Sequence, residues 1–389
     1  MKGGPNRGVF QVLLLATEIW RSPGGIQRYM KMLVDIMDLP GDRASILTLL
    51  DSEADIPPTL SCSSISCCGG SKWTFCLSAL RLAKSHKIQT AIVGHVALLP
   101  IAWMLKRLGY IQQYVVVLHG IEAWQRLRLL SRLSSRGVAA VIATTHYTAR
   151  EFCYHNKLGN LKSAIIPLGS TIKAPQGPPE IAGDLRLLTV TRLAVADLYK
   201  GVDTVLHAVS RGRELGLNLS LEIVGDGDDR GRLEGIARSL GVQAAVRFRG
   251  SVPDVELQKA YAHAHVFVLP SKKEGFGIAF LEAMSSGIPC IGANHGGVPE
   301  VITHSESGFL IEYGDVDELV VLLRALMESP TLLSHMSKAA LDRAKTLTFG
   351  AMAESWRSLL RDLQIRSVRA DNIVPADALS ALPDRRRTL

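Results

Sequence analysis

The sequence predicts an α/β protein made of two doubly wound parallel-sheet domains, each Rossmann-like. Short apolar runs of strand length alternate with segments of helical periodicity along most of the chain, and this alternation is typical of βαβ units. It is interrupted once, at residues 171–184, where TIKAPQGPPEIAGD concentrates proline and glycine. A chain of 389 residues with 47% hydrophobic side chains can bury two cores of ordinary size.

The first domain is expected over residues 1–170. Its strands are predicted at the apolar runs VFQVLLLA, TAIVGHV, YVVVLHG, VAAVIATT and SAIIPLG. Helical periodicity predicts the helices IQRYMKMLVDIM, 98–108, 122–135 and 146–156 between them. Because such sheets bind ligands beyond the carboxyl ends of their strands, polar residues that follow a strand are the candidates for a site.

Residues 171–184 are predicted to be a linker, and residues 185–347 a second domain of the same kind. Its alternating segments include LRLLTVTRL, GVDTVLHAVSRGREL, LSLEIVGDG, DRGRLEGIARSLG, AVRFRGS, DVELQKAYAHA, HVFVLPS, PCIGAN and PEVI. Residues 348–366 are amphipathic and are expected to form a helix that packs back on the first domain, whereas residues 367–389 lack a sustained period and are expected to be a flexible tail. The cleft between the two domains is the expected ligand site.

The apolar runs and the cysteines predict a cytoplasmic protein. The runs near residues 9–16 and 91–105 are too short or too interrupted to span a membrane, and no signal-peptide pattern opens the sequence. The six cysteines form no CxxC pair and accompany no histidine pair at zinc spacing, which predicts reduced thiols. A labile site at the cluster of Cys62, Cys67 and Cys68 is left open.

The net charge is +8, and its excess lies in the first half of the chain. Between Glu122 and Glu151, arginines alternate with apolar residues and no acidic residue occurs, while residues 71–87 combine Trp73 and Phe75 with lysines and an arginine. Basic helices with an apolar face suit an anionic membrane surface, here the inner face of the cytoplasmic membrane. Ordinary helices with a solvated basic face are an equally open interpretation. Nucleic acid is not an expected partner, because no nucleic-acid-binding motif accompanies the charge.

Residues 271–300, SKKEGFGIAFLEAMSSGIPCIGANHGGVPE, carry the strongest signal for a site. An apolar run precedes them and a helical pattern begins within them, so they read as a strand end, a glycine-rich turn and a helix N-terminus. Such a turn directs main-chain N–H groups at a ligand and favours phosphate; here they would come from Phe276, Gly277 and Ile278. Glu274 precedes the helix and Glu282 lies within it, so the two carboxylates can accept hydrogen bonds from a sugar and a ribose of one ligand.

These features resemble the retaining glycosyltransferases of family 4, the glycosyl transferases group 1, which have the GT-B fold of two Rossmann-like domains facing a cleft. The strongest match is EGFGIAFLEAMSSGIPCIGANHGGVPE, with its E-x7-E pair at Glu274 and Glu282. Supporting motifs in the family's order are SPGGIQRY, LHGIE, IIPLGS, TRL followed by KG, and VGDGDDRGRLEGIARSLGVQAAVRFRGSV. The resemblance extends from about Val9 to Gln364.

The resemblance implies that the chain binds a nucleoside diphosphate sugar as donor. Glu282 would bind the ribose, Glu274 would contact the donor sugar, and Arg192 and Lys200 would neutralise the diphosphate. A fixed guanidinium and an ammonium can stabilise a leaving diphosphate without metal, and no DxD motif is placed to hold a divalent ion. No metal and no other cofactor are therefore expected.

The resemblance assigns three further places to the site. His119, in LHGIE, would lie near the transferred sugar and give hydrogen-bonding electrostatic support. His95, in VGHV, also lies at a strand end and, on its position alone, is a weaker candidate on the acceptor side. Gly24 and Gly25 would approach a phosphate or the acceptor closely, because neither has a Cβ. Gly225 and the edge from Gly250 to Val252 would flank the nucleobase; a dinucleotide loop is disfavoured there because the glycines end an internal strand. The catalytic candidates are thus His119, Glu274, Arg192 and Lys200.

Two features depart from the family pattern. Thr191 stands where the family usually has a glycine before the arginine, which adds a Cβ beside the expected diphosphate. The segment AVADLY, residues 194–199, is inserted between Leu193 and Lys200. Both departures bear on how the donor is bound, and neither changes the predicted fold.

The expected activity is transfer of a hexosyl unit, with retention, from a nucleoside diphosphate sugar to a hydroxyl acceptor. The basic first domain points to an acceptor near an anionic membrane, such as a lipid-linked saccharide in envelope or exopolysaccharide biosynthesis. Two alternatives stay open: a phosphorylase or sugar-nucleotide epimerase of the same fold, and a non-catalytic protein that binds sugar nucleotides or membranes. The donor sugar, its base, the acceptor, the linkage and the oligomeric state cannot be read from the sequence.

Overall fold

The computed structural model describes residues 11–22, 24–37, 43–58, 60, 64–86, 88–159, 161–170, 180–181 and 183–365. Most of the predicted linker, the predicted tail at 367–389, and Cys62 lie outside these residues. The chain divides into two compact units. Unit 1 comprises residues 1–168 and 349–389, and unit 2 comprises residues 169–348.

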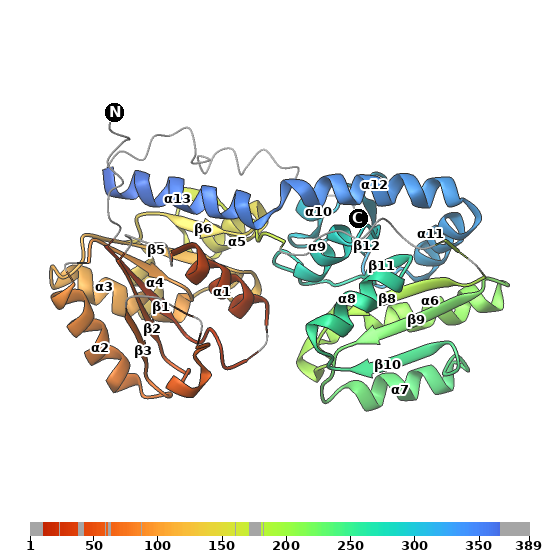
Figure 1. Cartoon of the computed structure of the whole chain (residues 1–389), viewed down its shortest axis with the longest axis horizontal. Helices are drawn as coiled ribbons and strands as arrows, with labels where there is room; N and C mark the ends of the chain where they lie inside the picture. The colour runs from red at the N-terminus through yellow and green to blue at the C-terminus, as the bar shows by residue number, and fades with distance from the viewer. Residues whose placement is uncertain are drawn as a thin grey trace. The chain divides into compact units, whose positions relative to one another are not determined.

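Unit 1 is built on a seven-stranded parallel sheet in the order β3-β2-β1-β4-β5-β6-β7 (Figure 1). The strands are β1 (Gln11–Ala16), β2 (Arg43–Thr48), β3 (Ser64–Cys67), β4 (Thr90–Val93), β5 (Gln113–Leu118), β6 (Val141–Ala143) and β7 (Ser163–Ile165). The register aligns Leu14 of β1 with Ile46 of β2 and Ile92 of β4. β1, β4 and β5 are almost wholly buried, as expected of strands covered on both faces.

The helices of unit 1 cover both faces of its sheet. They are α1 (Gly25–Met37), α2 (Lys72–Ser85), α3 (Leu99–Arg107), α4 (Leu129–Ser135), α5 (His146–Asn156) and α13 (Phe349–Ile365), with short 3-10 turns η1 (Glu53–Asp55), η2 (Val96–Leu98) and η3 (Ile121–Ala123). The right-handed crossover rule puts α2 to α5 on one face, because their connections all run towards β7, and α1 on the other. The last helix, α13, packs beside α1.

Unit 2 contains a six-stranded parallel sheet in the order β10-β9-β8-β11-β12-β13 (Figure 1). The strands are β8 (Leu185–Val190), β9 (Leu219–Val224), β10 (Val246–Gly250), β11 (Val266–Leu269), β12 (Cys290–Ala293) and β13 (Gly308–Ile311). The helices are α6 (Val202–Glu214), α7 (Arg230–Ser239), α8 (Asp254–His263), α9 (Ile278–Ser285), α10 (Val298–Val301), α11 (Val316–Glu328) and α12 (Pro330–Thr346), with a 3-10 segment η4 (Val195–Lys200). α6 packs against α11, and α9 against α12.

Each sheet reverses its winding direction at one point. In unit 1 the reversal lies between β1 and β4, and in unit 2 between β8 and β11. Ligands of doubly wound sheets bind beyond the carboxyl ends of the strands at such a point. The loops that follow β8 and β11 are therefore the first place to look for a site in unit 2, and those after β1 and β4 in unit 1.

The prediction of two doubly wound α/β domains is confirmed by these sheets. The interdomain cleft stays a prediction. Within the described ranges, no single helix is long and apolar enough to cross a membrane; α11 and α12 together meet the length and composition, but the chain bends by 103° between them.

Candidate functional site

The loop after β8 holds Arg192 beside a buried carboxylate. Arg192 Nε donates to Asp197 Oδ2 at 2.6 Å, and the hydroxyl of Tyr199 donates to Asp197 Oδ1 at 2.9 Å. The Asp197 side chain is 5% exposed, whereas that of Arg192 is 70% exposed. Burial acts to raise the pKa of Asp197, but the two hydrogen bonds outweigh it and hold the pKa below its ordinary value. Asp197 is thus an anion that fixes the base of an otherwise exposed guanidinium.

The loop after β11 brings Glu274 to Lys200. Lys200 Nζ lies 2.5 Å from Glu274 Oε2, and the two side chains are only 18% and 16% exposed. Gly201, which follows Lys200, has a positive φ of 71° and lies against the carbonyl of Pro270 at the start of the β11 loop. The two loops at the switch point are therefore joined by an ion pair and by a close main-chain approach.

Helix α9 begins directly after this loop. Its N-cap is Gly277, with a φ of 83°, a left-handed conformation that a side chain would strain. The first turn of a helix leaves main-chain N–H groups without intrahelical acceptors, and Phe276, Gly277 and Ile278 lie at this end. Further along, the buried carboxylate of Glu282 accepts a hydrogen bond from the Tyr261 hydroxyl at 2.8 Å. Tyr261 comes from α8, so a second helix fixes the orientation of Glu282.

The glycine-rich turn after β9 lies against the loop that carries Arg192. A Cβ added to Gly225 would overlap the carbonyl oxygen of Thr191, and one added to Gly227 would overlap that of Leu193. The close approach of two main chains thus explains why glycine stands at both positions. This agrees with the sequence argument against a dinucleotide loop here. Thr191 N–H also bonds to the carbonyl of Val224. Gly250 pairs with Gly225 at the end of β10, and half-buried Val252 follows.

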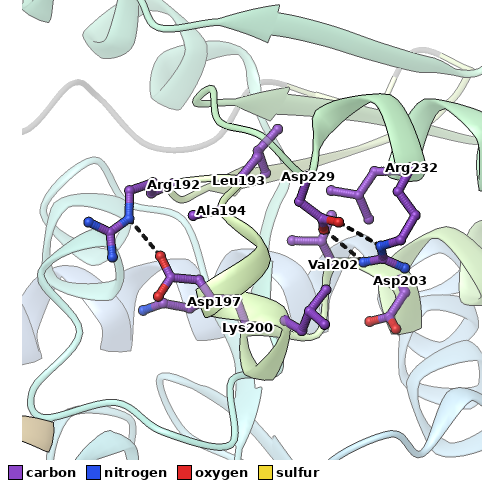
Figure 2. Close-up of a pocket in the computed structure, with 11 residues that line it drawn as sticks. Arg192, Leu193, Ala194, Asp197, Lys200, Val202, Asp203, Asp229 and Arg232 are labelled. Atoms are coloured by element: carbon purple, nitrogen blue, oxygen red, sulfur yellow. Dashed lines mark hydrogen bonds and ion pairs between the residues drawn. The ribbon is translucent and has the colours of Figure 1, made fainter.

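A pocket of unit 2 is lined by both predicted cations (Figure 2). Its lining residues are Arg192, Leu193, Ala194, Asp197, Leu198, Lys200, Val202, Asp203, Asp229, Arg232 and Leu233. Figure 2 shows the Arg192–Asp197 pair on one side and the Asp229–Arg232 pair on the other. Asp229 accepts hydrogen bonds of 2.6 and 2.7 Å from Arg232. Charged side chains thus lie on two sides of the pocket, and Arg192 and Lys200 line the same hollow.

In unit 1, His119 follows β5 at the carboxyl edge of the sheet. Its Nε2 lies 3.0 Å from the carbonyl oxygen of Gly94, so Nε2 carries a proton and donates it. Its Nδ1 is buried and has no hydrogen-bond partner in the part of the chain that the structure describes. Burial lowers the pKa of His119, and the nearby Glu122 offsets this only in part. The ring is therefore neutral at pH 7, with a lone pair on Nδ1 that can accept one hydrogen bond.

The ring of His119 is held by its neighbours in unit 1. Glu122 accepts hydrogen bonds from the main-chain N–H of His119 at 2.6 Å and of Gly120 at 3.1 Å. Tyr29 of α1 lies edge-on to the imidazole with ring centroids 5.1 Å apart, and its hydroxyl accepts a hydrogen bond from Trp356 Nε1 of α13 at 3.0 Å. Elements from three distant parts of the sequence thus fix this ring.

The loop after β1 is held by hydrogen bonds to a carboxylate that lies outside the motifs found in the sequence. Asp51, which is fully buried, accepts main-chain hydrogen bonds from Ile19 at 2.8 Å, Trp20 at 3.1 Å and Arg21 at 2.9 Å. Gly24 and Gly25 follow in this loop and are exposed, and Gly25 begins α1. The weaker candidate His95 follows β4, where its Nδ1 accepts from the N–H of Ala97 at 3.1 Å.

The two basic segments of unit 1 are split between core and surface. Phe75 lies in the core beneath α2 to α5, and half-buried Trp124 and Leu127 pack against that core. On α4, however, Leu129 is 65%, Leu130 56% and Leu133 43% exposed, and on α2, Trp73 is 83% and Leu77 52% exposed. Ordinary core-facing helices do not account for these five side chains.

The last candidates are the cysteines and the possible metal ligands. Cys67, Cys68, Cys76, Cys153 and Cys290 are free thiols, and burial raises the pKa of Cys67 and Cys68. Thiols with raised pKa values are less reactive. Among the described residues, no group of three or more His, Cys, Asp and Glu side chains is arranged to hold a metal ion.

Sequence reasoning named Arg192, Lys200, Glu274 and Glu282, and all four lie in unit 2, with Lys200 and Glu274 in direct contact. It did not name their partners Asp197, Tyr199 and Tyr261, or Asp51 in unit 1. These partners lie in segments without a motif. The one sequence signal was that Asp197 and Tyr199 belong to the inserted segment 194–199.

Comparisons with known proteins match unit 2 to a family and the chain to curated relatives. Residues 178–343, nearly the whole of unit 2, match the family described as Glycosyl transferases group 1. One curated relative is a GDP-mannose-dependent alpha-(1-6)-phosphatidylinositol monomannoside mannosyltransferase of Mycobacterium tuberculosis (strain CDC 1551 / Oshkosh). It is 28% identical over 302 residues, which cover 71% of this chain and 73% of the relative.

Solved structures agree in fold. Sucrose-phosphate synthase from Thermosynechococcus elongatus aligns with a TM-score of 0.75 and 20% identity, over 92% of this chain and 100% of that one. Anabaena HepE in complex with UDP aligns with a TM-score of 0.73 and 18% identity, over 91% and 100%. At such identities the likeness shows the fold alone, and it confirms the prediction of two α/β domains of the GT-B type. Unit 2 thus carries the match to the glycosyl transferases group 1 family, and the chain is a glycosyltransferase.

Proposed function

We propose that this glycosyltransferase moves a hexosyl unit from a nucleoside diphosphate sugar to a hydroxyl acceptor, with retention of the anomeric configuration and without a metal ion. The observation that carries the proposal is the assembly at the switch point of unit 2, where Arg192 and Lys200 line one pocket and Glu274 is in contact with Lys200. A guanidinium and an ammonium at a strand-end crevice suit a diphosphate.

Each group of the assembly has a defined task in this proposal. Arg192 and Lys200 bind the diphosphate, and the N–H groups of Phe276, Gly277 and Ile278 add to the positive end of α9. Glu274 accepts hydrogen bonds from hydroxyls of the donor sugar. Glu282, held by Tyr261, accepts from the ribose, and Gly225 and Val252 flank the base.

The reaction needs stabilisation of the leaving group more than acid–base chemistry. The acceptor oxygen forms a bond to the anomeric carbon on the face from which the diphosphate departs. The bond from that carbon to the phosphate oxygen breaks with its electron pair on the oxygen, and the acceptor proton passes to the departing phosphate. Because negative charge develops on the phosphate oxygens, fixed cations such as Arg192 and Lys200 lower the barrier.

His119 has a supporting role in this scheme. The neutral ring donates through Nε2 to Gly94, so its Nδ1 can only accept. We propose that Nδ1 accepts a hydrogen bond from a hydroxyl of the transferred sugar. A buried nitrogen without a partner is costly, and a sugar hydroxyl would remove that cost when the donor binds. Gly24 and Gly25 approach the phosphate or the acceptor from their loop.

The acceptor is proposed to be a lipid-linked saccharide of cell-envelope or exopolysaccharide biosynthesis, reached from the inner face of the cytoplasmic membrane. The relative from Mycobacterium tuberculosis is named as a mannosyltransferase of phosphatidylinositol monomannoside, which is a glycolipid. In this chain, support comes from the exposed leucines of α4, which alternate with Arg128, Arg132 and Arg136. Leucines that enter the headgroup region beside arginines that attract anionic lipid are typical of an interfacial helix.

A donor screen tests the enzymatic proposal. Thermal shift with UDP-, GDP- and ADP-sugars selects the donor, and product analysis then gives the anomeric configuration, with EDTA present throughout. We expect one base to stabilise the protein, and nucleotide to be released in proportion to acceptor glycosylated. Release that needs no acceptor, an inverted product, or activity abolished by EDTA and restored by a divalent ion would each contradict the proposal.

Vesicle flotation tests the membrane part separately. The protein should float with vesicles containing phosphatidylglycerol at low salt, less at high salt, and not with pure phosphatidylcholine. The variant Leu129→Ser/Leu130→Ser/Leu133→Ser should lose flotation. A matched control, Val255→Ser/Val321→Ser, removes two exposed valines of unit 2 and should float like the unchanged protein. Equal flotation of the α4 variant would refute the docking role of α4 and leave the donor proposal intact.

A further inference from the structure

We propose that Asp197 and Tyr199 are positioning residues that fix Arg192 and Lys200 for the donor diphosphate. This inference rests on the proposed function of the two cations. Neither residue belongs to a motif of the family resemblance, since both come from the inserted segment 194–199. The insertion thus supplies the support for the cations on either side of it.

Asp197 determines how Arg192 presents its guanidinium. The carboxylate accepts a hydrogen bond from Nε at 2.6 Å, while the two terminal nitrogens have no hydrogen-bond partner among the described residues. A 70% exposed arginine would otherwise sample many rotamers. With Nε anchored to a buried carboxylate, the two Nη groups stay available as a fork for phosphate oxygens, which is the geometry in which arginine binds phosphate best.

Tyr199 connects the Arg192 pair with the Lys200 pair. Its hydroxyl donates to Asp197 at 2.9 Å, and its carbonyl accepts the N–H of Lys272, in the β11 loop, at 2.8 Å. The ammonium of Lys200 lies 5.6 Å from the centroid of its ring, and that of Lys273 lies 5.7 Å from it. These distances fit cation–π contacts, so one side chain holds two lysines and the carboxylate that holds Arg192.

The alternative is that Asp197 and Tyr199 only stabilise unit 2. Both roles predict a less stable protein when either residue is changed, so stability alone does not separate them. A positioning role predicts in addition a loss of diphosphate affinity that depends on Arg192. Inorganic pyrophosphate is the suitable probe, because it carries the anionic part of the donor and no base or sugar.

The experiment is calorimetric titration of pyrophosphate, without divalent ions, into the full chain and its variants. We expect Asp197→Asn to weaken binding by about tenfold, the loss typical of one hydrogen bond to a charged group, and Tyr199→Phe to weaken it by less. In an Arg192→Lys background, Asp197→Asn should cause little further loss, because lysine has no Nε to anchor. Asp184→Asn is the matched control; it breaks a pair with Arg186 at the opposite end of β8 and should leave the affinity unchanged.

The outcomes separate the two proposals. If the unchanged protein does not bind pyrophosphate or any nucleoside diphosphate, the proposed function fails. If it binds, and Arg192→Ala loses binding while folded Asp197→Asn and Tyr199→Phe retain it, only the positioning inference is overturned. It is also overturned if Asp197→Asn weakens binding equally in the Arg192→Lys background, or if both variants are unfolded at the assay temperature while Asp184→Asn is not, since the pair would then be structural.

Discussion

The substitution Lys200→Met removes the ammonium at the centre of the candidate site and keeps an aliphatic stem. It leaves Glu274 without the cation that lies 2.5 Å away, in a place where the two side chains are 18% and 16% exposed. The change therefore acts twice. It leaves a largely buried carboxylate unpaired, and it removes one of two charges proposed to stabilise the leaving diphosphate.

The two effects have different magnitudes. Breaking a buried ion pair from one side costs about 3–5 kcal/mol, and an exposed pair contributes about 0–1 kcal/mol. For a pair at this partial exposure, we expect a loss of about 1–3 kcal/mol in the free energy of unfolding. For turnover, loss of one fixed charge-stabilising group lowers kcat by about 10²–10³.

The assay separates these effects by using a second variant. Urea unfolding gives the free energy of unfolding, and nucleoside diphosphate release with the selected donor gives kcat and KM. In Lys200→Met/Glu274→Gln no unpaired charge remains, so stability should return towards that of the unchanged protein while turnover stays low. A folded Lys200→Met enzyme with unchanged kcat and KM would refute the assignment of Lys200 to the diphosphate.

Three further predictions concern other parts of the two units. Gly225→Ala should destabilise unit 2 by about 2 kcal/mol or more, because a Cβ there overlaps Thr191 and the φ of 137° is strained for alanine. Unchanged stability in urea unfolding would show that the turns after β8 and β9 can separate without cost. Asp51→Asn should lower the free energy of unfolding by about 1–3 kcal/mol, since a buried carboxyl group that accepts three main-chain N–H groups is replaced by a weaker acceptor. An unchanged urea midpoint would contradict the anchoring role. The pKa of His119 is below 6.5 in the folded state, so the unfolded chain binds more protons in acid. The contribution of the neutral ring to stability is therefore complete above pH 6.5 and is lost as the pH falls towards the folded pKa. The profile of kcat/KM should show an acid limb below pH 6.5 that is absent in the residual activity of His119→Gln, and an identical limb in that variant would assign it to another group.

The sequence predicted the elements that surround the site because buried parallel strands are continuous apolar runs. β1, β4, β5 and β11 have this form, and their strand–turn–helix junctions carry the motifs. β2 and β3 were not predicted as strands, since RASILT and SISC are short and interrupted by polar residues. They lie on the side of β1 away from β4, where strand pairing supplies what local pattern lacks.

The candidate site could be predicted as a set of residues but not as a network. Motif spacing named Lys200 and Glu274, yet only the folded chain shows that their side chains meet. The partners Asp197, Tyr261 and Asp51 lie outside any motif, and Tyr261 and Asp51 bond to segments that are distant in sequence. A tyrosine in α8 gives no local sign that it will hold Glu282. The same limit applied to the basic segments, where periodicity could not separate buried Phe75 from exposed Trp73.

The helix α13 affects the order in which the two units are completed during synthesis. Unit 2 is continuous in sequence, whereas unit 1 is divided between residues 1–168 and the end of the chain. On the ribosome, the sheet of unit 1 emerges first, but Trp356, which bonds to Tyr29 and is fully buried, emerges only after all of unit 2. Because domains generally fold as they are made, the earliest-made domain is completed last. A nascent chain stopped shortly after Thr348 would contain every residue of unit 2 and still lack the helix that covers Tyr29 beside His119.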